Sequence, residues 1–142
     1  MLATLGALGV LVMTSIHHAY GAIVFDTPYR WHIIFISIPV ALVILAAAPV
    51  ARGGGSAMIS RVASWLYLGL VALFVIAAIG IYEGGYNHLI PNIQYVLGVE
   101  HPLREDLYKA PDDLFFQLTG IAQFVLAMLT ARWLWKLVSS AN

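Results

Sequence analysis

The stretch Thr14–His32, TSIHHAYGAIVFDTPYRWH, decides the fold, because it joins two apolar segments through one tight turn. Thr27 followed by Pro28 is the pattern of a helix N-cap with proline at the first helical position. We therefore expect Asp26 and Thr27 to form the turn between two antiparallel helices.

Three of the five histidines of the chain lie in this hairpin. A helix rises about 1.5 Å per residue, which places His18 roughly 10 Å below Phe25 and His32 roughly 7 Å below the turn. The two imidazoles are therefore expected at a similar depth on adjacent helices. Ionisable side chains at membrane depth indicate a functional site by default.

The composition is that of a membrane protein. Of 142 residues, 61% are hydrophobic and 10% are charged, whereas soluble domains carry about 25% charged residues. The formal net charge is zero, which gives no support for a nucleic-acid partner. The absence of cysteine excludes disulfides, thiolate metal sites and thiol catalysis. We expect an integral membrane protein whose main partner is the lipid bilayer.

Four apolar runs predict an all-α integral membrane protein with four transmembrane helices in one antiparallel bundle. Each run is long enough to cross a hydrocarbon core about 30 Å thick. The predicted spans cover approximately residues 2–25, 28–51, 60–83 and 111–138. The whole chain, residues 1–142, is expected to form a single domain.

A long outer loop is predicted between the third and fourth helices. Ser60 is expected to cap the third helix, and Gly84–Gly85 to end it. The following connection, residues 84–110, contains Pro91 and Pro102 and begins with an amphipathic segment too short to span a membrane. This segment is predicted to form a short interfacial helix. A connection of this length is more typical of a functional segment than of an idle linker.

The distribution of basic residues predicts the orientation. The short second loop carries Arg52 and Arg61, and the C-terminal end carries Arg132 and Lys136. All seven acidic residues lie on the opposite side, together with the other three basic residues. The positive-inside rule then places both termini in the cytoplasm and the histidines on the outer side. We expect the cytoplasmic membrane of a bacterium or an archaeon.

Polar side chains from all four helices are expected in the outer half of this bundle. Helical bundles hold metals between facing helices, and buried imidazoles need partners. The candidate metal ligands are His17, His18, His32, Glu83 and His88. The candidate supporting residues are Tyr20, Asp26, Tyr86, Asn87, Gln117 and His101. Because His17 and His18 differ by about 100° around a helix, either both flank one metal or one supports the other.

Some of these residues also have a purely structural interpretation. His101 is typical of an anchor at the membrane surface, and His32 has the position of a residue in the first turns of a helix. The alternative role of Glu83 is that of a carboxylate at the end of a helix, in a surface ion pair with Arg30 or Arg104. The prediction of a site therefore rests on the convergence of several groups at one depth.

Imidazole and oxygen ligands without cysteine favour Cu, Zn or Fe. The layout of histidines within four membrane helices is also similar to that of membrane b-type cytochromes, a resemblance that implies haem held by axial histidines. Those proteins place axial pairs across facing helices, often on both membrane sides. Because no histidine lies in the inner half here, the resemblance allows at most a single b-type haem.

Three classes of function remain open. The first is a membrane protein with a metal or haem site and a redox or metal-handling role. The second is a small non-catalytic subunit of a larger membrane complex, docked through the outer loop. The third is a proton or small-solute transporter, which the scarcity of ionisable residues in the inner half disfavours. Small-residue faces on the first and third helices allow a homo-oligomer.

Overall fold

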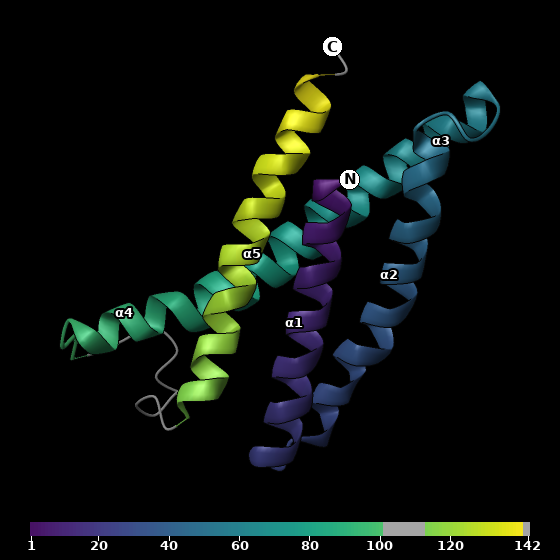
Figure 1. Ribbon diagram of the computed structural model, residues 1–142. Coiled ribbons are helices and arrows are strands. Elements are labelled where there is room, and N and C mark those ends of the chain that lie inside the picture. The colour runs from purple at the N-terminus through teal and green to yellow at the C-terminus, as the bar shows by residue number, and fades with distance from the viewer. Residues whose placement is uncertain (101–112, 141–142) are drawn as a thin grey trace.

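The computed structural model describes residues 1–100 and 113–140. Within these residues the chain is helical and contains no β-strand (Figure 1). The elements in chain order are α1 Leu2–Val24, a 3₁₀ turn Pro28–Trp31, α2 His32–Ala51, α3 Ala57–Gly69, a π-helical segment Leu70–Leu89 that we call the π segment, α4 Ile90–Val96 and α5 Leu114–Ser139. The predicted all-α class is confirmed.

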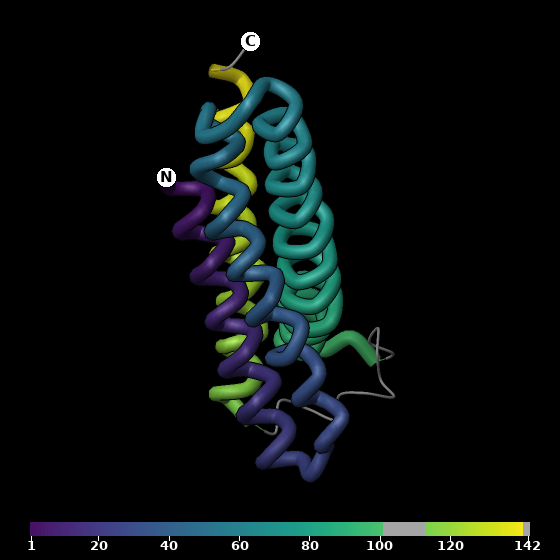
Figure 2. Tube along the Cα trace, turned by 90° about the vertical axis from the view of Figure 1, so that its right-hand side faces the viewer, coloured from purple at the N-terminus to yellow at the C-terminus, as the bar shows by residue number. Residues whose placement is uncertain are grey.

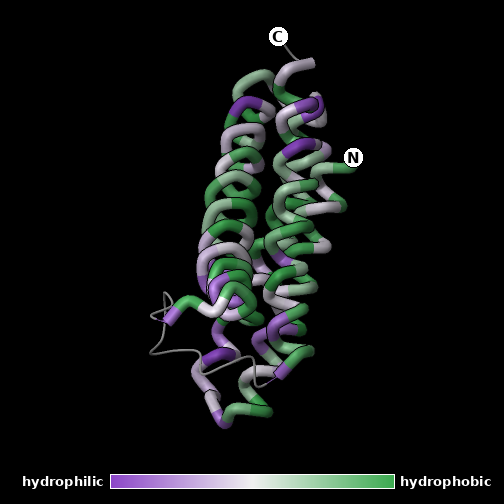
Figure 3. Tube along the Cα trace, turned by 90° about the vertical axis from the view of Figure 1, so that its left-hand side faces the viewer, coloured by the Kyte–Doolittle hydropathy of each residue, from purple (hydrophilic) through white to green (hydrophobic). Residues whose placement is uncertain are grey.

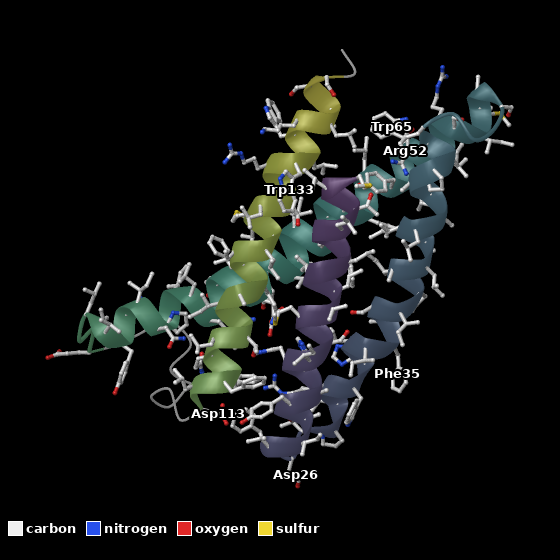
Figure 4. The ribbon with its side chains drawn as sticks, viewed as in Figure 1. Asp26, Phe35, Arg52, Trp65, Asp113 and Trp133 are labelled. Atoms are coloured by element: carbon white, nitrogen blue, oxygen red, sulfur yellow. The ribbon has the colours of Figure 1, made fainter. Side chains whose placement is uncertain are left out.

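In the described part of the chain, four helices are long and apolar enough to span a membrane. They are Leu2–Val24, Pro28–Ala51, Ala57–Val96 and Leu114–Ser139. These helices pack antiparallel, as predicted. Figure 4 places Asp26 and Asp113 at one end of the bundle and Arg52 at the other. Figure 3 shows mainly hydrophobic residues along the helices, with hydrophilic residues more frequent in the half of the bundle that lies away from the C-terminus.

The bundle is built around α5, which packs against both α1 and the π segment. Figures 1 and 2 show α3, the π segment and α4 as one long helix that crosses α1 and α5 obliquely. The apolar core lies toward the end that holds the N-terminus and includes Val10, Ile44, Val71 and Ala127. The polar residues of the π segment therefore lie on the Asp26 side of this core.

The third helix differs from the prediction at both ends. It begins at Ala57, because the Ser56 hydroxyl accepts the Ile59 N–H at 3.5 Å and caps it in place of Ser60. It does not end at Gly84–Gly85 but continues to Val96. Residues Ile90–Val96 are helical, as expected for a short helix in this connection, but they continue directly from the π segment.

Close packing against α5 explains why the glycine pair lies inside the helix. A Cβ atom on Gly84 would lie 2.6 Å from the Phe124 amide nitrogen and 2.9 Å from the Gly120 carbonyl oxygen. A Cβ on Gly80 would overlap the Ala127 side chain. Small residues allow the backbones of membrane helices to approach this closely. These glycines serve helix contact rather than helix termination.

The hairpin at Asp26–Thr27 lies where the sequence predicts it. Asp26 has a φ of 49°, and Pro28 is the first residue of the following 3₁₀ turn. The Thr27 hydroxyl does not cap this turn. It donates to the Gly21 carbonyl at 3.0 Å and accepts the Arg30 Nε–H at 2.9 Å. The hydroxyl thus ties α1 to Arg30.

We predict that Gly84→Ala destabilises the protein, because a methyl group there has no room against α5. The expected loss is about 1–3 kcal/mol of unfolding free energy, the usual range for overpacking. Gly69→Ala on the same helix is the matched control. A Cβ there meets nothing within 4 Å, so a gain of about 0.5–1 kcal/mol is expected. Thermal unfolding in detergent measures both, and equal effects would contradict the packing role of Gly84.

Candidate metal centre

Three imidazoles converge on the carboxylate of Glu83. The Nε2 atoms of His17, His18 and His88 lie 3.9, 3.8 and 3.7 Å from Glu83 Oε1. His17 and His88 are fully buried, and the Glu83 side chain is 20% exposed. The ligand atoms of His17, Glu83 and His88 all lie within 4.8 Å of one another. We call these three residues the His–Glu triad.

The π segment brings Glu83 and His88 together. In an α-helix, residues five apart point about 140° away from each other. In a π-helix the backbone hydrogen bond joins residues five apart, so these residues share one side. Asn87 lies on the same side and donates through Nδ2 to Glu83 Oε2 at 2.7 Å. The wide helical turn thus builds one half of the site from a six-residue stretch.

The Nδ1 atom of each imidazole has a partner outside the cluster. His18 Nδ1 lies 3.0 Å from the Thr14 carbonyl oxygen, which only accepts, so this nitrogen donates. His88 Nδ1 lies 3.1 Å from Gln117 Oε1, which also accepts from Asn92 Nδ2 at 2.8 Å. Both imidazoles are therefore assigned a proton on Nδ1, and in the neutral form of each ring Nε2 carries the lone pair.

The same tautomer follows for His17 from the hydrogen bonds of Thr119. The Thr119 hydroxyl has one proton, which it donates to the carbonyl of Phe115 at 2.8 Å or of Phe116 at 3.0 Å. Its oxygen then accepts from His17 Nδ1 at 3.0 Å. This places a lone pair on His17 Nε2. All three imidazoles direct lone pairs toward the carboxylate.

Such a cluster can hold a metal ion. Among the described residues, the buried Nε2 atom of His17 has no hydrogen-bond partner, an arrangement that costs free energy. Metal–ligand bonds of about 2.0–2.1 Å place the ligand atoms of a tetrahedral site about 3.3 Å apart. The distances from the imidazole Nε2 atoms to Glu83 Oε1 are a few tenths of an ångström longer. Hydrogen bonds from the far side of each imidazole are typical of metal-ligating histidines.

The cluster is closed on the α5 side. Phe116 stacks on His17, with ring centroids 4.0 Å apart and an interplanar angle of 21°. A Cβ on Gly120 would overlap the His88 ring, so only glycine leaves room for it. Phe116 and Gly120 thus fix the two imidazoles of the triad against α5.

The opposite side is open. A cavity of about 250 Å³ reaches Glu83 from the hairpin side. It is lined by His18, Tyr29, Arg30, His32, Ile33, Glu83 and Asn87. A ligand in this cavity has direct access to the carboxylate of the triad.

Of the five predicted ligands, the structure brings together His17, His18, Glu83 and His88. His18 contacts the carboxylate but lies outside the compact triad. His32 lines the cavity and is exposed, with Nδ1 hydrogen-bonded to the Tyr29 carbonyl. His32 is therefore a wall residue of the cavity and not a member of the triad.

The predicted supporting residues divide into two groups. Asn87 and Gln117 hydrogen-bond to triad residues, as described above. Tyr20 instead donates to Asp113 at 2.6 Å, and Tyr86 stacks on Tyr82 with ring centroids 5.8 Å apart. Asp26 is exposed in the hairpin turn. His101 lies outside the described residues.

Sequence reasoning missed Thr119, Phe116, Thr14 and Asn92. Thr119 and Gln117 differ by about 200° around α5, so they face different neighbours. Gln117 faces the π segment, and Thr119 faces α1. The sequence does indicate a polar residue on each of two sides of α5. Nothing in the spacing of residues, however, connects Thr119 with His17.

Neither a protein-family model, nor a curated protein sequence, nor a solved structure matches this chain. Its function is therefore argued from the geometry of the site alone.

Tyr20 belongs to a contact that closes the hairpin end of the bundle. Asp113 caps α5 by accepting the Phe116 N–H at 2.9 Å, and it accepts the Tyr20 hydroxyl as well. These hydrogen bonds, the one from Tyr20 first, hold the pKa of the Asp113 carboxyl below its usual value. The ionised form of Asp113 is therefore the form that stabilises this end.

We predict that Asp113→Asn reduces the loss of stability in acid. A depressed pKa stabilises the folded state above the unfolded pKa, near 3.9, and this contribution disappears as the pH falls through the folded pKa. Asparagine keeps the cap but does not titrate. Unfolding temperatures measured from about pH 5 to about pH 3 should fall less steeply in Asp113→Asn. The control Asp26→Asn, in the exposed turn, should follow the wild type, and identical slopes in all three proteins would exclude this role of Asp113.

Proposed function

We propose that this chain is an integral membrane metalloprotein that binds one transition-metal ion between His17, Glu83 and His88. The observation that carries the proposal is the direction of the imidazoles. Their Nε2 atoms converge on one carboxylate oxygen, while every Nδ1 is held by a hydrogen bond from behind. A cation at the centre satisfies the buried Nε2 atom of His17 and balances the negative charge of the Glu83 carboxylate.

Two imidazoles and one carboxylate indicate which metals suit the site. This donor set is found with Fe(II) in oxygen-activating proteins and with Zn in catalytic sites that keep open positions. The cavity beside Glu83 supplies space for such open positions. His18, at 3.8 Å from the same carboxylate oxygen, either completes the coordination or accepts a proton from a bound ligand. A redox or metal-handling role follows, with Fe, Zn and Cu as the candidate ions.

A metal ion fits this site better than a haem. The His17 and His88 ring centroids are 4.6 Å apart, and those of His17 and His18 are 5.2 Å apart. Phe116 covers the remaining face of His17 at 4.0 Å. Rings in such close contact leave no slot for a planar macrocycle. This packing favours an ion over the haem that the resemblance to b-type cytochromes implies.

The proposed location of the site follows from the charges of the loops. With Arg52 and Arg61 in the cytoplasm, both termini are cytoplasmic and the triad opens toward the outer side. The membrane would be the cytoplasmic membrane of a bacterium or an archaeon. Any ligand of the metal would therefore enter from outside the cell or from the periplasm.

We expect protein purified in mild detergent, stripped with chelator and titrated with Co²⁺, Zn²⁺ or Fe²⁺ to bind a single metal ion. His17→Ala, His88→Ala and Glu83→Gln should each lose this binding, because each removes a triad ligand. His32→Ala, which changes only the cavity wall, should keep it. Elemental analysis measures the content, and circular dichroism checks that the helices persist. Full metal content in His17→Ala or His88→Ala would refute the proposed centre, and redox cycling of bound iron or copper would separate the redox role from metal handling.

We also predict that Thr119→Val weakens metal affinity by about 10- to 100-fold, the usual effect of removing a partner behind a metal-bound histidine. Thr130→Val is the matched control. Thr130 is also a buried threonine of α5 that donates to a backbone carbonyl four residues back, at 2.7 Å, but it lies near Gly6 rather than His17. Its metal affinity should equal that of the wild type. Equal affinities in both variants would remove Thr119 from the support of the site.

A further inference from the structure

The cavity beside the His–Glu triad has a cation in its wall. Arg30 lines this cavity of about 250 Å³ together with Glu83 and His18. In the described part of the chain, Arg30 forms no ion pair with a carboxylate. No described carboxylate therefore neutralises the charge that Arg30 adds to the cavity wall.

Arg30 is held in place by contacts along its whole side chain. Its Nε donates to the Thr27 hydroxyl at 2.9 Å, and its guanidinium carbon lies 5.2 Å from the centre of the Phe116 ring. A Cβ on Gly21 would lie 3.2 Å from Arg30 Cδ, so glycine makes room for the stem of the side chain. A guanidinium fixed in this way loses little freedom when it binds an anion.

The charges around the cavity favour an anionic ligand. A divalent ion in the proposed triad contributes two positive charges and Arg30 contributes one, against one negative charge from Glu83. With the imidazoles counted as neutral, the described lining has an excess of positive charge. Uncompensated charge in a partly buried site costs free energy, and an entering anion lowers that cost.

We infer that the cavity binds a small carboxylate, with one oxygen on the metal and the other hydrogen-bonded to Arg30. Because Arg30 Nε donates to the Thr27 hydroxyl, its Nη groups are the donors for this oxygen, in a charge-assisted hydrogen bond that is stronger than one between neutral groups. Ile33 gives the wall an apolar face suited to a short carbon substituent. The cavity is smaller than the roughly 300–1,000 Å³ of sites for drug-sized ligands, so the carboxylate is small. This inference names the ligand class of the proposed metal site and rests on that proposal.

The test uses the full-length protein loaded with Co²⁺, whose visible spectrum responds to changes in coordination. Addition of acetate should produce a saturable spectral change in the wild type. Arg30→Gln should weaken acetate binding by about 10- to 100-fold, the effect of losing a charge-assisted hydrogen bond, with unchanged Co²⁺ affinity. Arg61→Gln, at the other end of the bundle, is the control and should bind acetate as the wild type does.

Each outcome decides one of the two proposals. A wild type that binds no metal overturns both the proposed function and the carboxylate site. A wild type that binds Co²⁺ but does not respond to acetate, or an Arg30→Gln variant that binds acetate normally, overturns the carboxylate site alone. Tighter binding of inorganic phosphate than of acetate also overturns it.

A second variant keeps the test decisive if Arg30→Gln fails to fold. Arg30→Lys retains the charge and the aliphatic stem near Phe116 but loses the planar guanidinium that the Thr27 hydroxyl holds in place. It should bind acetate more weakly than the wild type and with unchanged Co²⁺ affinity. Acetate affinity equal to that of the wild type in this variant would overturn the proposed role of the Arg30 guanidinium.

Discussion

The structure depends on one half-buried carboxylate that lies among three imidazoles. Glu83 Oε1 has the Nε2 atoms of His17, His18 and His88 within 3.7–3.9 Å. In an apolar bundle such groups are tolerated only where each polar atom finds a partner. The Nδ1 atoms find theirs on α1 itself and on α5, so the cluster specifies how these two helices face the π segment.

The π segment is the local device that makes this cluster possible. Its wide turn places His88 beside Glu83 together with Asn87, whereas an α-helix would bring only Asn87, four residues away, to that side. The same segment meets α5 at Gly84 and Gly120, where side chains are absent and the backbones approach closely. Local helix geometry and interhelical packing therefore act on the same few residues.

The sequence is sufficient to predict the spans and the hairpin but not the long third helix. Apolar runs and the Thr27-Pro28 pattern are local signals, and both are reflected in the structure. A glycine pair such as Gly84–Gly85 is a local signal for the end of a helix. Here the pair lies inside the helix because it packs against α5. The pairing of Glu83 with His88 requires a π turn, and the support of His17 by Thr119 joins residues 102 positions apart. The spacing of residues along the sequence indicates neither the π turn nor the contact between Thr119 and His17. It does indicate that several histidines lie at one depth.

Phe116 connects the closed side of the site with the open one. Its ring stacks on His17 and lies 5.2 Å from the Arg30 guanidinium carbon, so one side chain of α5 positions both a triad imidazole and the cation of the cavity. Structural metal sites surround their ion with four protein ligands and exclude others. Here the compact ligand set has three members and a cavity adjoins one of them. In the proposed metal site, an incomplete ligand set beside a fixed positive charge would suit the exchange of an anionic ligand rather than a purely structural role.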